Sequence, residues 1–179
     1  MSSTVKLDPE RTALVLIDLM PRIVGLKTAP HTGDTVLAGC LRMADAFRAV
    51  YAPVVTVRVE RPNVDKQPPG SELVPAVAER SDVEVVKRSW GAFYGTNLNA
   101  ALGARGIKTI VLGGIATNMG VESTARAAAD HGYQLVFVED AMTGLDSDAH
   151  KFVVDYIFTR LGTVSGVDEV IAAVSDGPG

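Results

Sequence analysis

The sequence has 179 residues, of which 47% are hydrophobic and 21% are charged, with a formal net charge of −4 at pH 7. These values are typical of a globular protein, and we expect one domain over residues 1–179. The chain has no long basic run and no apolar run that could span a bilayer, which argues against nucleic acid and membranes as partners. Its first residues lack the apolar core of a secretion signal, so we expect a cytoplasmic protein.

The first half of the chain alternates apolar runs with an amphipathic helix. Residues 13–17, A-L-V-L-I, show no polar alternation and predict a parallel strand buried on both faces. Apolar residues at helical spacing predict a helix from about 32 to 50. The run V-V-T-V-R-V after Pro53 predicts a second strand, and V-E-V-V, which ends at Lys87, predicts a third. The proline-rich segment at 61–70 predicts a loop between these strands.

The second half repeats this alternation. A loop with three aromatic residues at 88–97 precedes a helix at about 97–105, which Gly106 closes. The β-branched run from 107 ends in Gly113-Gly114 and predicts a fourth strand, followed by a short polar step and a helix that stops at Gly132. The remaining predicted elements are a strand at 135–138, a helix that Ser147 caps and that runs to about 160, a short strand near 163–164 and a helix near 167–174.

Strands that alternate with helices predict right-handed crossovers and a parallel sheet that is covered on both sides. We therefore expect an α/β fold, a three-layer α/β/α sandwich around a central parallel sheet of about six strands. In such folds the ligand site lies beyond the carboxyl ends of the strands.

Asp18, Lys87 and Gly120 follow the first, third and fourth predicted strands, so all three are expected at this edge of the sheet. Taken singly, the aspartate could be a solvated turn residue and the lysine a surface charge. Together they could instead form a shared site.

Four segments resemble, in order and spacing, the isochorismatase-like hydrolases of the cysteine hydrolase superfamily. They read A-L-V-L-I-D-L-M-P, V-V-K-R-S-W-G-A-F-Y-G-T-N-L, G-I-A-T-N-M-G-V-E-S-T-A-R and V-E-D-A-M, and together they span nearly the whole chain. In that family an aspartate and a lysine activate a cysteine, and the resemblance places those roles on Asp18 and Lys87. Gly120 stands in place of the cysteine. The resemblance also implies a cis peptide bond between Ile115 and Ala116, a small-molecule substrate, no cofactor and assembly into homo-oligomers.

Glycine offers no nucleophile, so covalent catalysis through position 120 is closed. True isochorismatases, which the site also resembles, have a glycine there and hydrolyse a vinyl ether with a proton donor. By that resemblance Asp18 is the expected general acid, with a pKa raised by burial, and Lys87 is its electrostatic partner. The turn here reads G-I-A-T-N-M-G instead of the G-V-Y-A-H-x-G of isochorismatases. The expected substrate is therefore a small organic molecule with an acidic or carbonyl group.

Two other functions remain open from the sequence. The chain could be an inactive family member that serves as a binding or scaffold oligomer. It could also be an amidase or esterase in which Ser123, one helical turn beyond Gly120, acts as a displaced nucleophile.

The expected substrate-binding residues come from the turn and from two loops. Backbone N–H groups near Ala116 and Gly120 could hold an oxyanion, and each arginine could equally be a solvated surface charge. The candidates are Ala116, Thr117 and Asn118 in the turn, Arg58, Arg61 and Arg88 as cationic groups, and Trp90, Phe93 and Tyr94 as walls.

No metal site or cofactor is expected. The histidines at 31, 131 and 150 are far apart in the sequence, and the loop after the second strand has Asp65 but no histidine. No G-x-G-x-x-G motif follows the first strand, which argues against a dinucleotide. Cys40, the only cysteine, lies in a helical pattern and is expected to be buried and inert.

Overall fold

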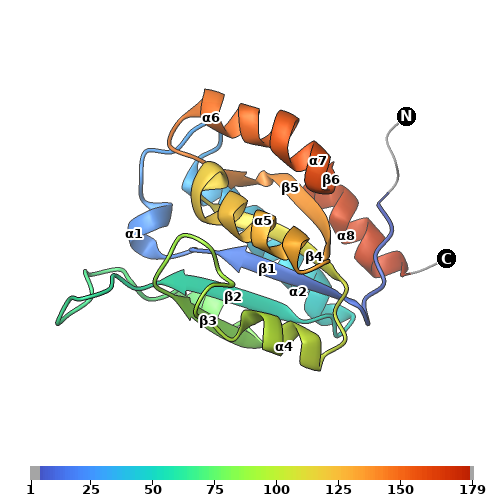
Figure 1. Ribbon diagram of the computed structural model, residues 1–179. Coiled ribbons are helices and arrows are strands. Elements are labelled where there is room, and N and C mark those ends of the chain that lie inside the picture. The colour runs from blue at the N-terminus through green and yellow to red at the C-terminus, as the bar shows by residue number, and fades with distance from the viewer. Residues whose placement is uncertain (1–4, 178–179) are drawn as a thin grey trace.

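The computed structural model describes residues 5–177, in which a six-stranded parallel sheet lies between two layers of helices (Figure 1). The strand order is β3-β2-β1-β4-β5-β6, and this arrangement confirms the predicted three-layer α/β/α fold. The strands are β1 Thr12–Ile17, β2 Val54–Val59, β3 Val83–Lys87, β4 Thr109–Ile115, β5 Gln134–Thr143 and β6 Thr163–Ser165.

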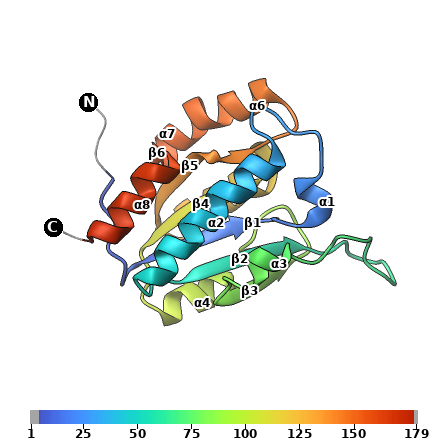
Figure 2. The same ribbon diagram turned by 180° about the vertical axis from the view of Figure 1, so that it is seen from behind.

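Helices cover both faces of the sheet (Figures 1 and 2). One face carries α2 (Gly33–Ala49), α8 (Val167–Asp176) and the short α3 (Pro75–Ala78), and α1 (Pro21–Val24) lies at its edge. The other face carries α4 (Leu98–Ala104), η1 (Thr117–Val121), α5 (Glu122–Asp130), α6 (Ser147–Phe152), η2 (Val153–Phe158) and α7 (Thr159–Leu161).

Alternate residues of β1 belong to two separate hydrophobic cores. Leu14 and Leu16 pack under α2, whereas Ala13, Val15 and Ile17 pack on the opposite face. Every residue of β1 is buried, because a central parallel strand has helices on both sides. The absence of polar alternation in this segment is thereby explained.

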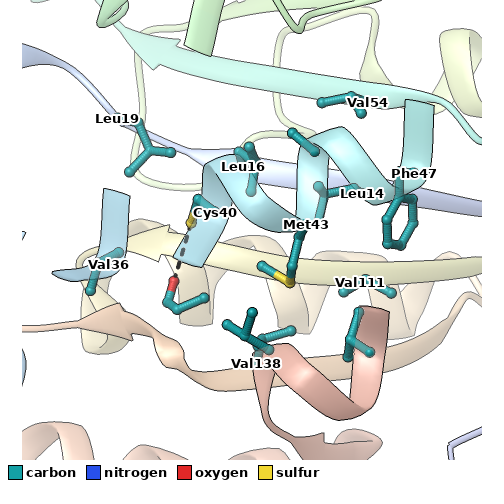
Figure 3. Close-up of a cluster of buried hydrophobic side chains, with 14 of the residues drawn as sticks. Leu14, Leu16, Leu19, Val36, Cys40, Met43, Phe47, Val54, Val111 and Val138 are labelled. Carbon is teal, nitrogen blue, oxygen red and sulfur yellow. Dashed lines mark hydrogen bonds between the residues drawn. The ribbon is translucent and has the colours of Figure 1, made fainter. Parts of the chain in front are cut away.

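Cys40 lies on the buried face of α2, beside Met43 (Figure 3). Its Sγ is 3.5 Å from the carbonyl oxygen of Ala141, to which the thiol donates, and burial raises the pKa of the thiol. This placement matches the inert, buried cysteine expected from the sequence.

Several element boundaries differ from those predicted. β5 continues to Thr143 instead of ending at Val138, and its pairing with β4 shifts register between Leu112 and Gly114. The cap of α6 is Asp146, which accepts a hydrogen bond from the Ala149 N–H at 2.8 Å, and not Ser147. α1 and α3 were missed, because each has only four residues and begins with proline.

The end of β1 lies very close to the end of β4. Gly114 has a φ of 121°, and a Cβ atom built on it would lie 2.2 Å from the carbonyl oxygen of Ile17. Glycine is therefore required for this approach. Asp18, the next residue of the β1 segment, has a φ of 53° and donates its N–H to the Val57 carbonyl at 2.8 Å. Its side chain thus leaves the strand at a fixed point on the sheet edge.

Within residues 5–177, no helix is long and apolar enough to cross a membrane. The first four residues, on which part of the secretion-signal prediction depends, lie outside the described residues.

Candidate active site

Asp18 and Lys87 form a buried ion pair at the carboxyl ends of β1 and β3. Asp18 Oδ2 is 2.9 Å from Lys87 Nζ, and their side chains are only 9% and 2% exposed. The ammonium group also donates to the carbonyl oxygens of Trp90 at 2.8 Å and Ser89 at 3.3 Å. Each of its three protons thus has an acceptor, and the lysine is held in one position.

Of the two carboxyl oxygens of Asp18, only one forms an ion pair or a hydrogen bond with a residue that the structure describes. Asp18 Oδ1 is buried and has no hydrogen-bond partner among the described residues. Burial raises the pKa of Asp18, and this effect outweighs the opposing influence of Lys87 and, more weakly, Arg22. Asp18 therefore holds a proton more tightly than an exposed carboxyl group does.

Gly120 faces this ion pair from η1. A Cβ atom built on Gly120 would lie 3.3 Å from Asp18 Oδ2, 3.3 Å from Lys87 Nζ and 3.2 Å from Ile17 Cγ2. Any side chain at position 120 would therefore point directly at the two charged groups. The peptide bond between Ile115 and Ala116, just before η1, is cis.

Thr124 joins η1 to the loop at 88–97. Its hydroxyl donates to the Gly120 carbonyl at 2.7 Å and accepts from the Ala92 N–H at 3.1 Å. Both bonds are buried, so they fix the position of Gly120 relative to the loop that also receives the ammonium of Lys87. Sequence reasoning missed this residue. Its only sequence signal is a threonine four residues after the glycine on a helix.

A cavity of about 400 Å³ opens above Asp18, Lys87 and Gly120. Its polar floor contrasts with walls that are largely apolar, and Glu60, Arg61 and Arg88 lie at its border. A pocket with apolar walls and a few convergent polar groups is suited to a small organic ligand. The apolar walls include Ile23, Leu26, Val59, Trp90, Met119 and Leu145.

Four of the nine expected binding residues line this cavity, namely Ala116, Arg61, Arg88 and Trp90. Arg88 forms an ion pair with Glu60 at 2.9 Å. The Arg61 side chain is exposed and forms no ion pair within the part of the chain that the structure describes. Of the two arginines, Arg61 is therefore the one whose guanidinium is uncommitted.

The remaining three loop and strand candidates lie outside the cavity lining. Arg58 is held by Glu60 at 2.8 Å and Glu84 at 2.7 Å, on the neighbouring strand β3. Phe93 is buried and packs against the ring of His131 at 4.9 Å, whereas Tyr94 is 83% exposed. Of the aromatic trio only Trp90 meets the cavity, so the expectation for Phe93 and Tyr94 as walls is not matched by their placement.

The turn residues Thr117 and Asn118 also do not line this cavity. Thr117 is fully buried and forms a 2.8 Å hydrogen bond with His150 Nδ1. Ser123 lies against Gly91, where a Cβ atom on the glycine would be 3.6 Å from the serine Cβ, and it too is absent from the lining. The serine is thus not placed as a nucleophile toward the cavity.

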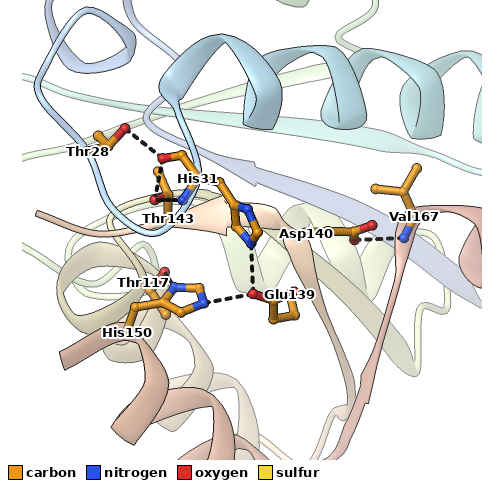
Figure 4. Close-up of polar contacts among 8 residues, drawn as sticks. All are labelled: Thr28, His31, Thr117, Glu139, Asp140, Thr143, His150 and Val167. Atoms are coloured by element: carbon orange, nitrogen blue, oxygen red, sulfur yellow. Dashed lines mark hydrogen bonds and ion pairs between the residues drawn. The ribbon is translucent and has the colours of Figure 1, made fainter. Parts of the chain in front are cut away.

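Two of the three histidines meet, although they are far apart in the sequence. His31 and His150 both lie within hydrogen-bonding distance of Glu139 (Figure 4), whereas His131 lies apart against Phe93. Burial lowers the pKa of His150 despite the nearby carboxylate. Burial also tends to raise the pKa of Glu139, but the two histidines outweigh it and keep that pKa below its usual value.

Comparison with known proteins identifies the family. The isochorismatase domain matches residues 12–169 of the chain. The chain belongs to the isochorismatase family. The family protein YecD of Escherichia coli O157:H7 is 41% identical over 187 residues, which cover 95% of this chain and all of YecD. Membership in this family makes the protein a hydrolase.

A solved structure of an isochorismatase family protein from Burkholderia thailandensis superposes with a TM-score of 0.83 and 41% sequence identity. The match covers 96% of this chain and 99% of that one. Ureidoacrylate amidohydrolase RutB of Variovorax paradoxus is 41% identical over 91 residues, but these cover only 50% of this chain and 36% of RutB.

Proposed function

We propose that this isochorismatase-family hydrolase cleaves a small organic substrate by non-covalent acid–base catalysis at Asp18, Lys87 and Gly120. The bond that is cleaved is the C–O bond of a vinyl ether or a related C–O or C–N bond. One observation carries the proposal: position 120 has no side chain at a point 3.3 Å from both charged groups. Since no nucleophilic side chain fills that point, water is the nucleophile.

For a vinyl ether, Asp18 donates its proton to the terminal alkene carbon as general acid. The resulting oxocarbenium ion takes up water, which loses a proton to the Asp18 carboxylate. The hemiketal then collapses to a carbonyl compound and an alcohol, and the acid is regenerated. Lys87 contacts Oδ2, so it stabilises the carboxylate that forms after proton transfer.

The protein environment favours the acid form of Asp18. Burial already raises the pKa of Asp18. A substrate that fills the apolar cavity displaces water from the carboxyl group and raises that pKa further. Binding of the substrate thus prepares the proton donor.

Polar groups around the cavity orient the substrate. Arg61 and Arg88 offer cationic groups for a carboxylate, and Trp90 offers an apolar wall. Backbone N–H groups near Ala116 and Gly120, where η1 begins, hold an oxyanion or a carboxylate. This set suits a small molecule that carries an acidic or carbonyl group.

A second function, a binding or scaffold oligomer without turnover, is favoured by the exposed apolar residues at the cavity. Leu26, Trp90 and Leu145 are 44%, 63% and 49% exposed, and all three line the cavity. Such residues would pack in a subunit interface of a dimer or larger homo-oligomer.

A substrate panel of vinyl ethers, amides and hydroxamates separates these functions. In D₂O, the wild-type protein should release a carbonyl product with one deuterium on the former alkene carbon, and no covalent adduct should appear by mass spectrometry. Wild-type turnover through an acyl-enzyme would contradict the proposal.

Gly120→Cys sharpens this test, with Gly103→Cys as the control because position 103 is exposed on α4 and has nothing within 4 Å of an added Cβ. If wild type turns over nothing and only Gly120→Cys cleaves amides, the natural protein is a binding or scaffold protein. The half-length match to RutB makes ureido amides a suitable part of the panel.

A further inference from the structure

Three side chains from separate elements meet beside Thr117 of η1, outside the lining of the Asp18 cavity. His31 lies in the loop before α2, Glu139 in β5 and His150 in α6. His31 Nε2 and His150 Nε2 lie 2.8 Å and 3.0 Å from the same oxygen, Glu139 Oε1 (Figure 4). The three ligand atoms all lie within 4.8 Å of one another. We call this group the His31–Glu139–His150 cluster.

We propose that the His31–Glu139–His150 cluster is a binding site for one divalent transition-metal ion, with Zn²⁺ as the preferred ion. Two imidazole nitrogens and one carboxylate oxygen form a donor set that suits Zn²⁺ and similar ions, and less so Mg²⁺ or Ca²⁺. Bonds of about 2.0–2.2 Å around a tetrahedral ion hold its ligand atoms about 3.3 Å apart. The two nitrogen–oxygen pairs at 2.8 Å and 3.0 Å therefore need to open by a few tenths of an ångström, and the two nitrogens, which lie within 4.8 Å of each other, need to reach the same spacing.

The surroundings of His150 provide the second shell of such a site. His150 Nδ1 lies 2.8 Å from Thr117 Oγ1, so the ring can donate its Nδ1 proton to the hydroxyl while Nε2 binds the ion. A metal-bound imidazole almost always makes this kind of bond through its other nitrogen. When the ion binds, each ring carries its proton on Nδ1 and directs its Nε2 lone pair to the metal, because Nε2 no longer bears a proton that points at Glu139 Oε1.

The main chain at His31 is fixed before any ion binds. The N–H of His31 donates to Thr143 Oγ1 at 3.2 Å, and its carbonyl accepts from the hydroxyls of Thr143 and Thr28, both at 2.8 Å. Ala29 and Gly144 exchange two backbone hydrogen bonds of 2.9 Å and 3.1 Å beside it. Preformed ligand positions reduce the ordering cost of metal binding.

An ion can reach the cluster from solvent. His31 and Glu139 are 28% and 36% exposed at their side chains, whereas His150 is 4% exposed. A cavity of about 360 Å³ borders Glu139 and His150 together with Asp148 and Asp155. Three protein ligands leave a fourth position of the ion open to this cavity, where water completes the coordination. No residue lines both this cavity and that of Asp18.

The test measures Zn²⁺ binding to full-length protein prepared without a histidine tag and stripped with EDTA, by competition with a chromogenic chelator. Wild type should bind one ion per chain. His31→Ala and Glu139→Gln should each weaken binding by at least about 100-fold, and Thr117→Val by about 10- to 100-fold as a second-shell change. His131→Ala, which removes an exposed imidazole outside the cluster, should leave the affinity unchanged.

Co²⁺ gives a second readout, because a tetrahedral cobalt site absorbs visible light. These bands should appear in wild type and His131→Ala and be absent in His31→Ala. Circular dichroism checks folding, and His31→Ala and Thr117→Val decide the matter if Glu139→Gln does not fold. Equal Zn²⁺ affinity in wild type and His31→Ala, or no binding to wild type, would overturn the proposal and leave a hydrogen-bonded cluster only.

Discussion

Two polar clusters border η1, and they handle charge differently. Gly120 faces the Asp18–Lys87 pair, whereas Thr117, three residues earlier, contacts His150. The Asp18–Lys87 pair is almost fully buried, and the ammonium offsets part of the cost of burying the carboxyl group. In the His31–Glu139–His150 cluster, one partly exposed carboxylate oxygen meets two imidazole nitrogens. The first cluster thus pairs two opposite charges, whereas the second brings together one ligand atom from each of three side chains, and the proposed metal site rests on that difference.

The largest effect is expected from a substitution that removes the proposed general acid of the Asp18–Lys87 pair and leaves the His31–Glu139–His150 cluster intact. Asp18→Asn should lower kcat/KM on the true substrate by about 10²- to 10⁴-fold, the usual contribution of a general acid. Steady-state kinetics measures this loss. Zn²⁺ affinity should not change in this variant. Asp65→Asn, in the exposed loop at 61–70, serves as the control. Wild-type activity in Asp18→Asn would refute the mechanism.

Lys87→Met tests whether the first cluster depends on charge neutralisation. Removal of one partner from a buried pair should lower the free energy of unfolding by about 3–5 kcal/mol at neutral pH. Urea denaturation measures it, with the exposed Lys108→Met as the control.

The same variant should show a distinct pH dependence. Burial raises the pKa of Asp18 above that of an ordinary aspartate, so at a pH between the unfolded and folded pKa values the folded state holds a proton that the unfolded state has lost. Stability is therefore fully present below the unfolded pKa and falls as pH rises through the folded pKa. This loss should be larger in Lys87→Met than in wild type and should extend to higher pH, because the ammonium no longer offsets burial. A pH-independent stability in Lys87→Met would contradict this account.

Thr124→Val sharpens the comparison because it removes hydrogen bonds near the ion pair and none near His150. The change leaves the Ala92 N–H and the Gly120 carbonyl without their shared partner, and should cost about 1–3 kcal/mol of stability. Thermal or urea denaturation measures this loss. KM should rise as well, whereas Zn²⁺ affinity should stay within error of wild type.

The smallest expected effect distinguishes Arg61, at the border of the cavity, from Arg58, which lies outside its lining. Arg61→Ala should raise KM about 10-fold with kcat nearly unchanged, because a charged contact to the substrate carboxylate is lost. Arg58→Ala should leave KM unchanged, since its guanidinium is held by Glu60 and Glu84 outside the cavity lining. A larger rise in KM for Arg58→Ala than for Arg61→Ala would reverse this assignment.

The sequence predicted the fold and the position of the first cluster for a simple physical reason. Asp18, Lys87 and Gly120 each lie at or just after the end of a strand, and the carboxyl ends of parallel strands meet at one edge. The strands themselves were recognisable from uninterrupted apolar runs. The boundary of β5 was not, because Glu139 and Asp140 interrupt its apolar run while the backbone pairing continues to Thr143.

The second cluster could not be read from the sequence. His31 and Glu139 are 108 residues apart, and although Glu139 follows the predicted strand at 135–138, the three residues form no spaced ligand motif. Their contact depends on the Ala29–Gly144 pairing, which joins a loop to the extended end of β5. Likewise, the exposure of Tyr94 and the burial of Phe93 depend on the course of the 88–97 loop, which no periodic pattern specifies.

The missing side chain of Gly114 has a consequence for redesign. Because the main chains of β1 and β4 touch where a methyl group would collide with the Ile17 carbonyl, the spacing of these two strand ends beneath the site is set by the backbone. An engineer could thus exchange the reactive group at position 120, or reshape the apolar walls, and keep the same span across the site. The spacing of the two strand ends does not depend on which side chains line the site.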